Sequence, residues 1–244
     1  MLSVILPAYN EGYVIGDTLR QLTDSLDASL ADFEILVVDD GSDDNTAEVV
    51  RGLMRSEPRI NLISYQPNHG KGYAVHRGFD ESSGAFIALF DADLDIPPQC
   101  ILGLYTMLLD SPHDGVIGSK VHRESSTTDI SFNRRLITKS TNLLVRLLFR
   151  LPFRDTQVGV KVFRKRVIDA VRPHLITNGF TADIELLYWA HQKGFTIVDG
   201  PVTIKQFTSN SSVNIRAIMT ATVEIFTLFF RTRISQFIGG RNAA

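Results

Sequence analysis

The sequence predicts an α/β fold in which helices cover both faces of a mostly parallel sheet. Segments with strand character alternate with segments of helical period through the first half of the chain. The predicted strands are continuous apolar runs, as expected of strands that are buried on both faces. Polar or acidic residues follow strand ends at positions 10–11, 39–40 and 91–95. Because ligands bind beyond the carboxyl ends of the strands in such sheets, these groups predict one common site.

The first half supplies most of the predicted sheet. We predict strands over Leu2–Pro7, Phe33–Val38, Ile60–Tyr65, Ala85–Phe90 and Val116–Ser119. We predict helices over Val14–Leu30, Thr46–Met54, Gly72–Glu81 and Cys100–Leu109. Asn45 or Asp44 suits the N-cap of the second helix.

The second half adds a basic amphipathic segment and an apolar tail. Polar residues Glu124–Ile130 predict a loop, and Ser131–Leu151 predicts a helix. The basic residues of this helix fall within about 80° of one another, beside a leucine-rich face; they are Arg135, Lys139, Arg146 and Arg150. Such a helix can lie on an anionic membrane surface, or it can pack its leucines in the core. The later predicted elements are a strand at Val158–Phe163, a helix at Ala182–Gln192, a strand at Thr196–Val198 and an apolar tail at Val213–Ile238.

Composition excludes several classes of protein. The 244 residues contain one cysteine, Cys100, which excludes an internal disulfide framework and fits a reducing compartment. Strand-like sequence follows Met1 directly and no run of 18 apolar residues occurs, so we expect neither a signal peptide nor a transmembrane helix. Residues 1–113 have 6 Lys+Arg against 18 Asp+Glu, whereas residues 114–166 have 12 against 4. This asymmetry predicts a cation site beside a surface for an anionic partner, or two patches that balance each other.

Three carboxylates follow the fourth predicted strand at i, i+2 and i+4. They are Asp91, Asp93 and Asp95 in the segment FDADLD. In an extended chain alternate side chains share a face, so all three would converge on one hard cation, Mg²⁺ or Mn²⁺. Because Mg²⁺ typically pairs one or two carboxylates with substrate phosphates, a nucleotide diphosphate is the implied ligand. The alternative is a solvated turn before a helix that starts near Pro97 and Pro98.

The other strand ends also contain candidate site residues. Asn10 and Glu11 can hold a base or ribose, or they can cap the next helix. Asp39 and Asp40 can accept from a nucleobase N–H, or they can form an ordinary turn. Lys71, in the glycine-rich segment 68–72, can face a diphosphate, although the spacing is not that of a P-loop.

Two acids in the second half are candidates for work on an acceptor. Asp155 lies among cations, after the basic helix. Asp183 opens a predicted helix, where it can favour the helix N-terminus, orient an acceptor or act as a base.

Taken together, six segments in order resemble family 2 glycosyltransferases with the GT-A fold, which is Rossmann-like. They are VILPAYNE at 4–11, ILVVDDGSDDNT at 35–46, NHGKGYAVHRGF at 68–79, FDADLDIPP at 90–98, RDTQVGVKVFRKRV at 154–167 and GFTADIELLYWA at 179–190. The chain is most similar to polyprenyl-phosphate hexosyltransferases of the dolichyl-phosphate glucose or mannose synthase type. The pattern at 155–163 is closer to the glucose synthases, which implies UDP-glucose. The resemblance implies a domain over 1–210, with a donor and metal half at 1–113 and an acceptor half at 114–210, followed by an amphipathic helical tail at 211–244.

The resemblance also implies residue roles. The nucleoside would be surrounded by Pro7, Tyr9, Asn10, Glu11, Asp39 and Asp40. Lys71 would approach the diphosphate, and the metal and sugar phosphate would meet Asp91, Ala92 and Asp93. Lys120 and Arg134 or Arg135 would meet acceptor or donor phosphate. The chain departs from the family in three places: Asp95 stands where mannose synthases commonly have Gln, Lys120 where relatives often have Arg, and residues 210–213 where many have Gly-Ser-Lys-Leu. Lys205 or Arg216 would then have to supply the missing lysine's charge.

The expected chemistry is an inverting transfer of a hexose to a polyprenyl phosphate. A metal and Lys71 would neutralise the leaving diphosphate. A lipid monophosphate is already an anionic nucleophile, so it needs positioning by cations more than a base. We expect peripheral attachment to the cytoplasmic face of a membrane, no nucleic-acid partner, and leave the oligomeric state open. The alternatives are a GDP-mannose donor, a soluble acceptor with Asp155 or Asp183 as base, a nucleotidyltransferase, and a degenerate nucleotide-binding module.

Overall fold

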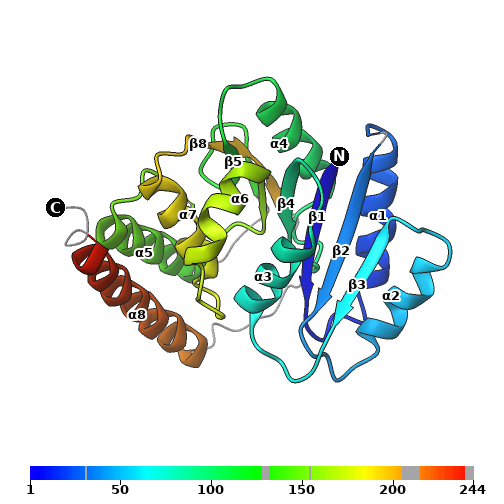
Figure 1. The fold of residues 1–244 in the computed structure, drawn as a ribbon, viewed down its shortest axis with the longest axis horizontal. Coiled ribbons are helices and arrows are strands. Elements are labelled where there is room, and N and C mark those ends of the chain that lie inside the picture. The colour runs from blue at the N-terminus through cyan, green and yellow to red at the C-terminus, as the bar shows by residue number, and fades with distance from the viewer. Residues whose placement is uncertain (31, 128–131, 154, 205–214, 240–244) are drawn as a thin grey trace.

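The computed structural model describes residues 1–30, 32–127, 132–153, 155–204 and 215–239. A seven-stranded sheet has the order β3-β2-β1-β4-β7-β5-β8 (Figure 1). Its strands are β1 (Leu2–Ala8), β2 (Phe33–Asp39), β3 (Ile60–Ser64), β4 (Phe86–Phe90), β5 (Gly115–Ser119), β7 (Val160–Arg164) and β8 (Ile197–Pro201). All of these strands run parallel except β7, which is antiparallel to both β4 and β5. The predicted mostly parallel sheet is therefore confirmed.

Helices cover both faces of the sheet, as predicted. They are α1 (Ile15–Asp27), α2 (Thr46–Met54), α3 (Lys71–Glu81), α4 (Gln99–Leu109), α5 (Phe132–Phe149), α6 (Lys165–Val171), α7 (Ala182–Gln192) and α8 (Ile215–Gly239), with a 3₁₀ turn at Arg172–His174. Alternate strand residues face opposite cores: Val4 of β1 packs in the core that contains residues of α1, α2 and α4, whereas Ile5 packs in the core that contains residues of α3 and α5–α8. The tail thus belongs to the second core through Ile225 and Leu228.

One local prediction needs correction. Part of the predicted loop at 124–130 is a short strand, β6 (Ser126–Thr127), which pairs with β9 (Thr203–Ile204) in a separate two-stranded sheet; residues 128–131 lie outside the described part. This strand depends on a contact between distant residues, which a local pattern does not contain. At the start of α2, Asp44, one of the two residues that the sequence offered for the cap, accepts the Thr46 amide (2.9 Å).

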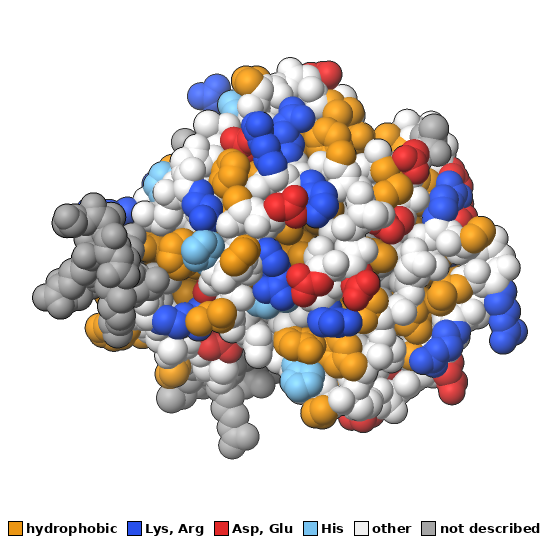
Figure 2. All heavy atoms as spheres, viewed as in Figure 1, with side chains coloured by type: hydrophobic (Ala, Val, Ile, Leu, Met, Phe, Trp, Pro, Cys, Tyr) orange, Lys and Arg blue, Asp and Glu red, His pale blue; other side chains and the backbone are white. Residues whose placement is uncertain are grey.

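Acidic and basic side chains are interspersed on the face shown in Figure 2. One ion pair joins the two halves of the chain, since Arg172 binds Asp80 at 2.7 Å. This ion pair links the acidic first half to a cation that lies just beyond the basic stretch 114–166.

Candidate active site

A cavity of about 600 Å³ lies at the carboxyl edge of the sheet, beyond the ends of β1 and β4. We call it the sheet-edge cavity. It brings together eight of the predicted site residues: Pro7, Tyr9, Glu11, Asp40, Lys71, Asp91, Ala92 and Asp93. It is also lined by Ala8, Asn68, Gly70, Gly179, Phe180 and Glu224. The common site that the strand ends predict is therefore formed by residues far apart in sequence.

Asp40 shapes the wall of this cavity with both carboxylate oxygens. One oxygen accepts from the Tyr65 hydroxyl and the His69 amide, each at 2.9 Å. The other accepts from the Asn68 side chain (2.9 Å) and the Gly70 amide (2.8 Å). A carboxylate offers about four acceptor positions, so a nucleobase N–H would have to displace one of these bonds. In this geometry Asp40 holds the loop 68–70 in place, and its expected role beside the nucleoside stays a prediction.

Asp39 and Asn10 lie outside the cavity lining. Asp39 is buried and accepts from the Ser42 amide (3.1 Å) and the Ser64 hydroxyl (2.8 Å). Asn10 is exposed, and its side-chain oxygen accepts from the Asp43 amide at 2.9 Å. The Asn10 bond fastens the loop after β1 to the loop after β2, whereas Asp39 stabilises its own turn, which is the alternative that the sequence left open for Asp39.

Lys71 is the first residue of α3, and its ammonium nitrogen lies 2.6 Å from a carboxylate oxygen of Asp91. Burial alone would lower the pKa of Lys71, but the negative charges of Asp91 and Asp183 outweigh it and raise that pKa. The start of α3 packs closely against the backbone at Thr177, because a Cβ added to Gly72 would lie 2.2 Å from the Thr177 carbonyl oxygen. A cation is thus held at the edge of the cavity, as recognition of a diphosphate requires.

The aspartates after β4 form a turn instead of an extended chain. Leu94 has a φ of +60°, and Asp93 accepts the Asp95 amide at 3.0 Å. Among the residues that the structure describes, no group of three His, Cys, Asp or Glu side chains is arranged to hold a metal. The predicted convergence of Asp91, Asp93 and Asp95 is therefore wrong: the first two line the cavity and the third does not.

The chemistry at this turn still suits a divalent cation. Burial raises the pKa of Asp93, and the nearby charge of Asp91 raises it further. Burial and the charge of Asp93 likewise raise the pKa of Glu11. The carboxylate oxygen Oδ1 of Asp95 is buried without a hydrogen-bond partner in the described structure. Acids that repel one another in this way favour a positive ion, and Mg²⁺ needs only one or two carboxylates beside substrate oxygens.

The acceptor side contains a buried ion pair that the sequence did not reveal. Lys161 of β7 is 2% exposed, and its ammonium lies 3.1 Å from Asp183 and 2.6 Å from the Val158 carbonyl oxygen. A lysine inside the apolar strand VKVF was the available signal, since a buried cation requires partners. Asp183, predicted as a site residue, is thus positioned by a neighbouring strand.

None of the remaining predicted site residues is part of the described lining of the sheet-edge cavity. Asp155 is buried and accepts a long 3.4 Å bond from Asn142 of α5. Lys120 follows β5 at the same edge of the sheet and is half-buried, outside the cavity lining. Arg134 and Arg135 belong to α5, and their side chains lie outside the part that the structure describes.

Two lining residues were not predicted as site residues. Phe180, in the matching segment 179–190, is 66% exposed at the cavity. Glu224 of α8 accepts from the Thr181 amide (3.2 Å) and hydroxyl (3.3 Å), so the tail reaches the cavity wall. This contact joins positions 43 residues apart, and no local pattern indicates it.

The family described as Glycosyl transferase family 2 matches residues 3–172. The chain belongs to this family. It is 32% identical over 203 residues to Glycosyltransferase AglD of Haloferax volcanii, covering 82% of this chain and 32% of that protein. It is 30% identical over 210 residues to a dolichyl-phosphate beta-glucosyltransferase of Dictyostelium discoideum (81% of this chain, 64% of that one) and 29% over 225 residues to that of Saccharomyces cerevisiae (83% and 66%). The chain thus spans from one third to just under two thirds of the length of these relatives.

Solved structures confirm the GT-A-like fold of this family 2 chain. Glucosyl-3-phosphoglycerate synthase of Mycobacterium tuberculosis, in complex with Mn²⁺, UDP and phosphoglyceric acid, aligns with a TM-score of 0.73 at 16% identity, over 95% of this chain and 78% of that one. The same enzyme with Mg²⁺ and UDP gives a TM-score of 0.72. Within the described residues of this glycosyltransferase, no helix is long and apolar enough to cross a membrane.

Proposed function

We propose that the chain transfers a hexose from a nucleotide-diphosphate sugar, with UDP-glucose as the best candidate, to a polyprenyl phosphate such as dolichyl phosphate. The observation that supports it most is the Lys71–Asp91 pair beside Asp93 in one cavity at the carboxyl edge of the sheet. The relatives named dolichyl-phosphate beta-glucosyltransferase support the acceptor and the sugar. The UDP bound to the structurally similar synthase supports uracil as the nucleobase of the donor.

The residues of the cavity suggest how the donor is bound. Asp91 and Asp93 would hold a divalent cation, which would neutralise part of the negative charge of the diphosphate. Lys71 lies next to both carboxylates, and its ammonium would donate to the leaving diphosphate. The rim residue Phe180 would exclude water from the sugar.

The acceptor phosphate would approach near the start of α5, which contains Arg134 and Arg135. A lipid monophosphate needs no general base, because its oxygen is already an anionic nucleophile. Lys120 and Arg134 or Arg135 would position it, and in-line attack would invert the anomeric centre. Asp183 is already paired with Lys161, which favours a positioning role over that of a base for a soluble acceptor.

We infer that the chain works at a membrane surface. Leu143 and Leu147 of α5 are 55% and 69% exposed, and Phe230 of α8 is 61% exposed. Apolar side chains on two helices next to the acceptor side suit attachment to the surface of a bilayer. The side of the membrane stays a prediction.

A transfer assay tests the proposal and makes the first prediction. Labelled UDP-glucose and GDP-mannose would each be incubated with polyprenyl phosphate in detergent, with Mg²⁺, Mn²⁺ or chelator. We expect metal-dependent label in the lipid phase from UDP-glucose, and a loss of at least about 100-fold in Asp93→Asn. The matched control is Asp110→Asn, an exposed acid beyond α4, which should keep full activity. Label from GDP-mannose alone would show that the donor is GDP-mannose and not UDP-glucose. No lipid label from either donor would refute polyprenyl phosphate as the acceptor.

A further inference from the structure

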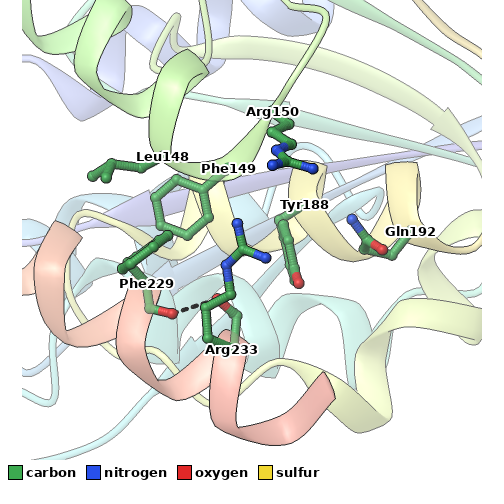
Figure 3. Close-up of a pocket in the computed structure, with 8 residues that line it drawn as sticks. Leu148, Phe149, Arg150, Tyr188, Gln192, Phe229 and Arg233 are labelled. Atoms are coloured by element: carbon green, nitrogen blue, oxygen red, sulfur yellow. Dashed lines mark hydrogen bonds between the residues drawn. The ribbon is translucent and has the colours of Figure 1, made fainter. Parts of the chain in front are cut away.

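A second cavity, of about 190 Å³, lies between the end of α5, α7 and α8 (Figure 3). We call it the α5–α8 pocket. Its described lining is Leu148, Phe149, Arg150, Tyr188, Gln192, Phe229, Thr232 and Arg233. None of these residues lines the sheet-edge cavity. The pocket is therefore a separate site, which the proposed transfer reaction does not use.

The charge in this pocket is positive. Arg150 comes from the end of α5 and Arg233 from α8, and no acidic residue is part of the described lining. In the described structure neither arginine forms an ion pair with a carboxylate. Arg233 lies over the Phe229 ring, 5.4 Å from its centroid. Two guanidinium groups that line one pocket suit a phosphate, because each can donate two parallel hydrogen bonds to its oxygens and is weakly hydrated.

The backbone at Arg150 supports a role in binding. Its φ of +54° lies in the left-handed region, which helix ends usually assign to glycine or asparagine. A long charged side chain in this position is an outlier of the kind that gathers at ligand sites. Glycine there would relax the backbone but would remove the guanidinium from the pocket.

Exposed apolar side chains adjoin the pocket on both helices. On α5, Leu143 and Leu147 lie one turn apart, and on α8 the exposed residues Val223, Phe226 and Phe230 have the spacing i, i+3, i+7. Arg233 continues the row of Phe226 and Phe230 along α8. A phosphate site that borders two apolar stripes has the polarity of a phospholipid, with an anionic headgroup above its acyl chains. A water-soluble phosphate would leave both stripes without a partner.

Helix α8 connects this pocket to the candidate active site. Glu224 lines the sheet-edge cavity and Arg233 lines the α5–α8 pocket. Their separation of nine residues corresponds to roughly 14 Å along the helix axis. A lipid bound at Arg233 would therefore hold the cavity at a set distance from the bilayer surface.

We propose that the α5–α8 pocket binds the phosphate of an anionic bilayer phospholipid. This lipid is neither donor nor acceptor; the inference rests on the proposed work at a membrane surface, but it is tested by binding and not by transfer. Sedimentation of the full chain with vesicles of phosphatidylcholine, with and without phosphatidylglycerol, measures it. We expect binding to the anionic vesicles, and a loss of roughly ten- to thirty-fold in affinity in the double variant Arg150→Gln, Arg233→Gln.

Two controls separate a site from diffuse attraction. Arg51→Gln with Arg55→Gln makes the same charge change on exposed residues at the far side of the molecule, at α2. Arg146→Gln removes an exposed cation from α5 that does not line the pocket. We expect both to lose much less affinity than the pocket variant. Equal losses in pocket and control variants, or no binding to anionic vesicles by the unaltered chain, would overturn the proposal.

A soluble anion is the other possible source of the same phosphate chemistry. Glycerol 3-phosphate, titrated calorimetrically into the unaltered chain, tests it. Binding of this compound that depends on Arg150 and Arg233, without binding to vesicles, would overturn the lipid assignment. Transfer in detergent should be unchanged in the pocket variant, so a failed transfer assay leaves this test intact.

Discussion

Lys161 is a buried charge that positions Asp183. It lies in the middle of β7, and its ammonium contacts the Val158 carbonyl oxygen and Asp183. Lys161→Met would fill the same space without the charge and leave Asp183 unpaired in a largely buried position. We expect a loss of roughly 3 kcal/mol in the free energy of unfolding, measured in urea.

A double variant tests whether Lys161 and Asp183 act as a pair. Asp183→Asn in the Lys161→Met background removes the unpaired charge, so part of the lost stability should return. Losses that simply add up would show that the two residues stabilise the fold independently. Loss of transfer in all three variants, with only the single variants unstable, would assign the pair a positioning role.

His76 predicts a pH dependence of stability. It is a buried residue of α3, and its Nε2 has no hydrogen-bond partner in the described structure. Burial, with the charge of Arg172, lowers its pKa from 6.5 to about 4. Between these two values the unfolded chain binds a proton that the folded chain does not, so stability falls as the pH falls.

The measurement for His76 is urea unfolding at pH 7 and pH 5. The histidine should contribute a loss on the order of 2 kcal/mol between these two values, at about 1.4 kcal/mol per pH unit inside the window. His76→Leu should show a correspondingly smaller difference between the two. The same pH dependence in the variant would assign the effect to other groups.

At the scale of elements, one buried acid fastens α8 to the loop before α7. Glu185 of α7 is 1% exposed and accepts from the Ile176 and Thr177 amides and from Arg231 of α8. Arg231→Gln would leave this carboxylate with one cation fewer. We expect α8 to loosen, with faster amide hydrogen exchange over α8 and residues 177–181, and a loss of about 2 kcal/mol in stability.

A control for Arg231 lies on the same molecule. Arg77→Gln removes a cation whose pair with Glu81 is exposed, so it should cost at most about 0.5 kcal/mol. Unchanged exchange over α8 in Arg231→Gln would mean that apolar contacts alone, such as those of Ile225 and Leu228, hold the tail.

Elements with a strong local period could be predicted, and those defined by distant partners could not. Strands β1 to β5 and helices α1 to α4 follow apolar runs and helical spacing that are properties of the segments themselves. The antiparallel direction of β7 depends on its neighbours, β4 and β5. Strand β6 exists because it pairs with β9, 77 residues away. Likewise the strand ends predicted the cavity, but the turn at Leu94 and the reach of Glu224 follow from tertiary packing.

At the scale of the whole molecule, the two halves share one sheet. The pairing of β4 with β7 joins the two halves, because β4 belongs to residues 1–113 and β7 to residues 114–210. We call this strand pair the seam. A fragment of residues 1–113 would expose the apolar edge of β4, and exposed edges pair with other chains. We expect this fragment to self-associate in light scattering, whereas the full chain, in which β7 covers β4, should do so far less. A monomeric 1–113 fragment would contradict this.

The same seam imposes an order on events at the ribosome. Strand β4 ends at residue 90 and its partner β7 begins at residue 160, so about seventy residues must be synthesised before that edge is covered. At typical elongation rates of about 5–20 residues per second, the emerging chain exposes an unpaired strand for several seconds. During this interval the nascent chain has an exposed strand edge with which other chains can pair.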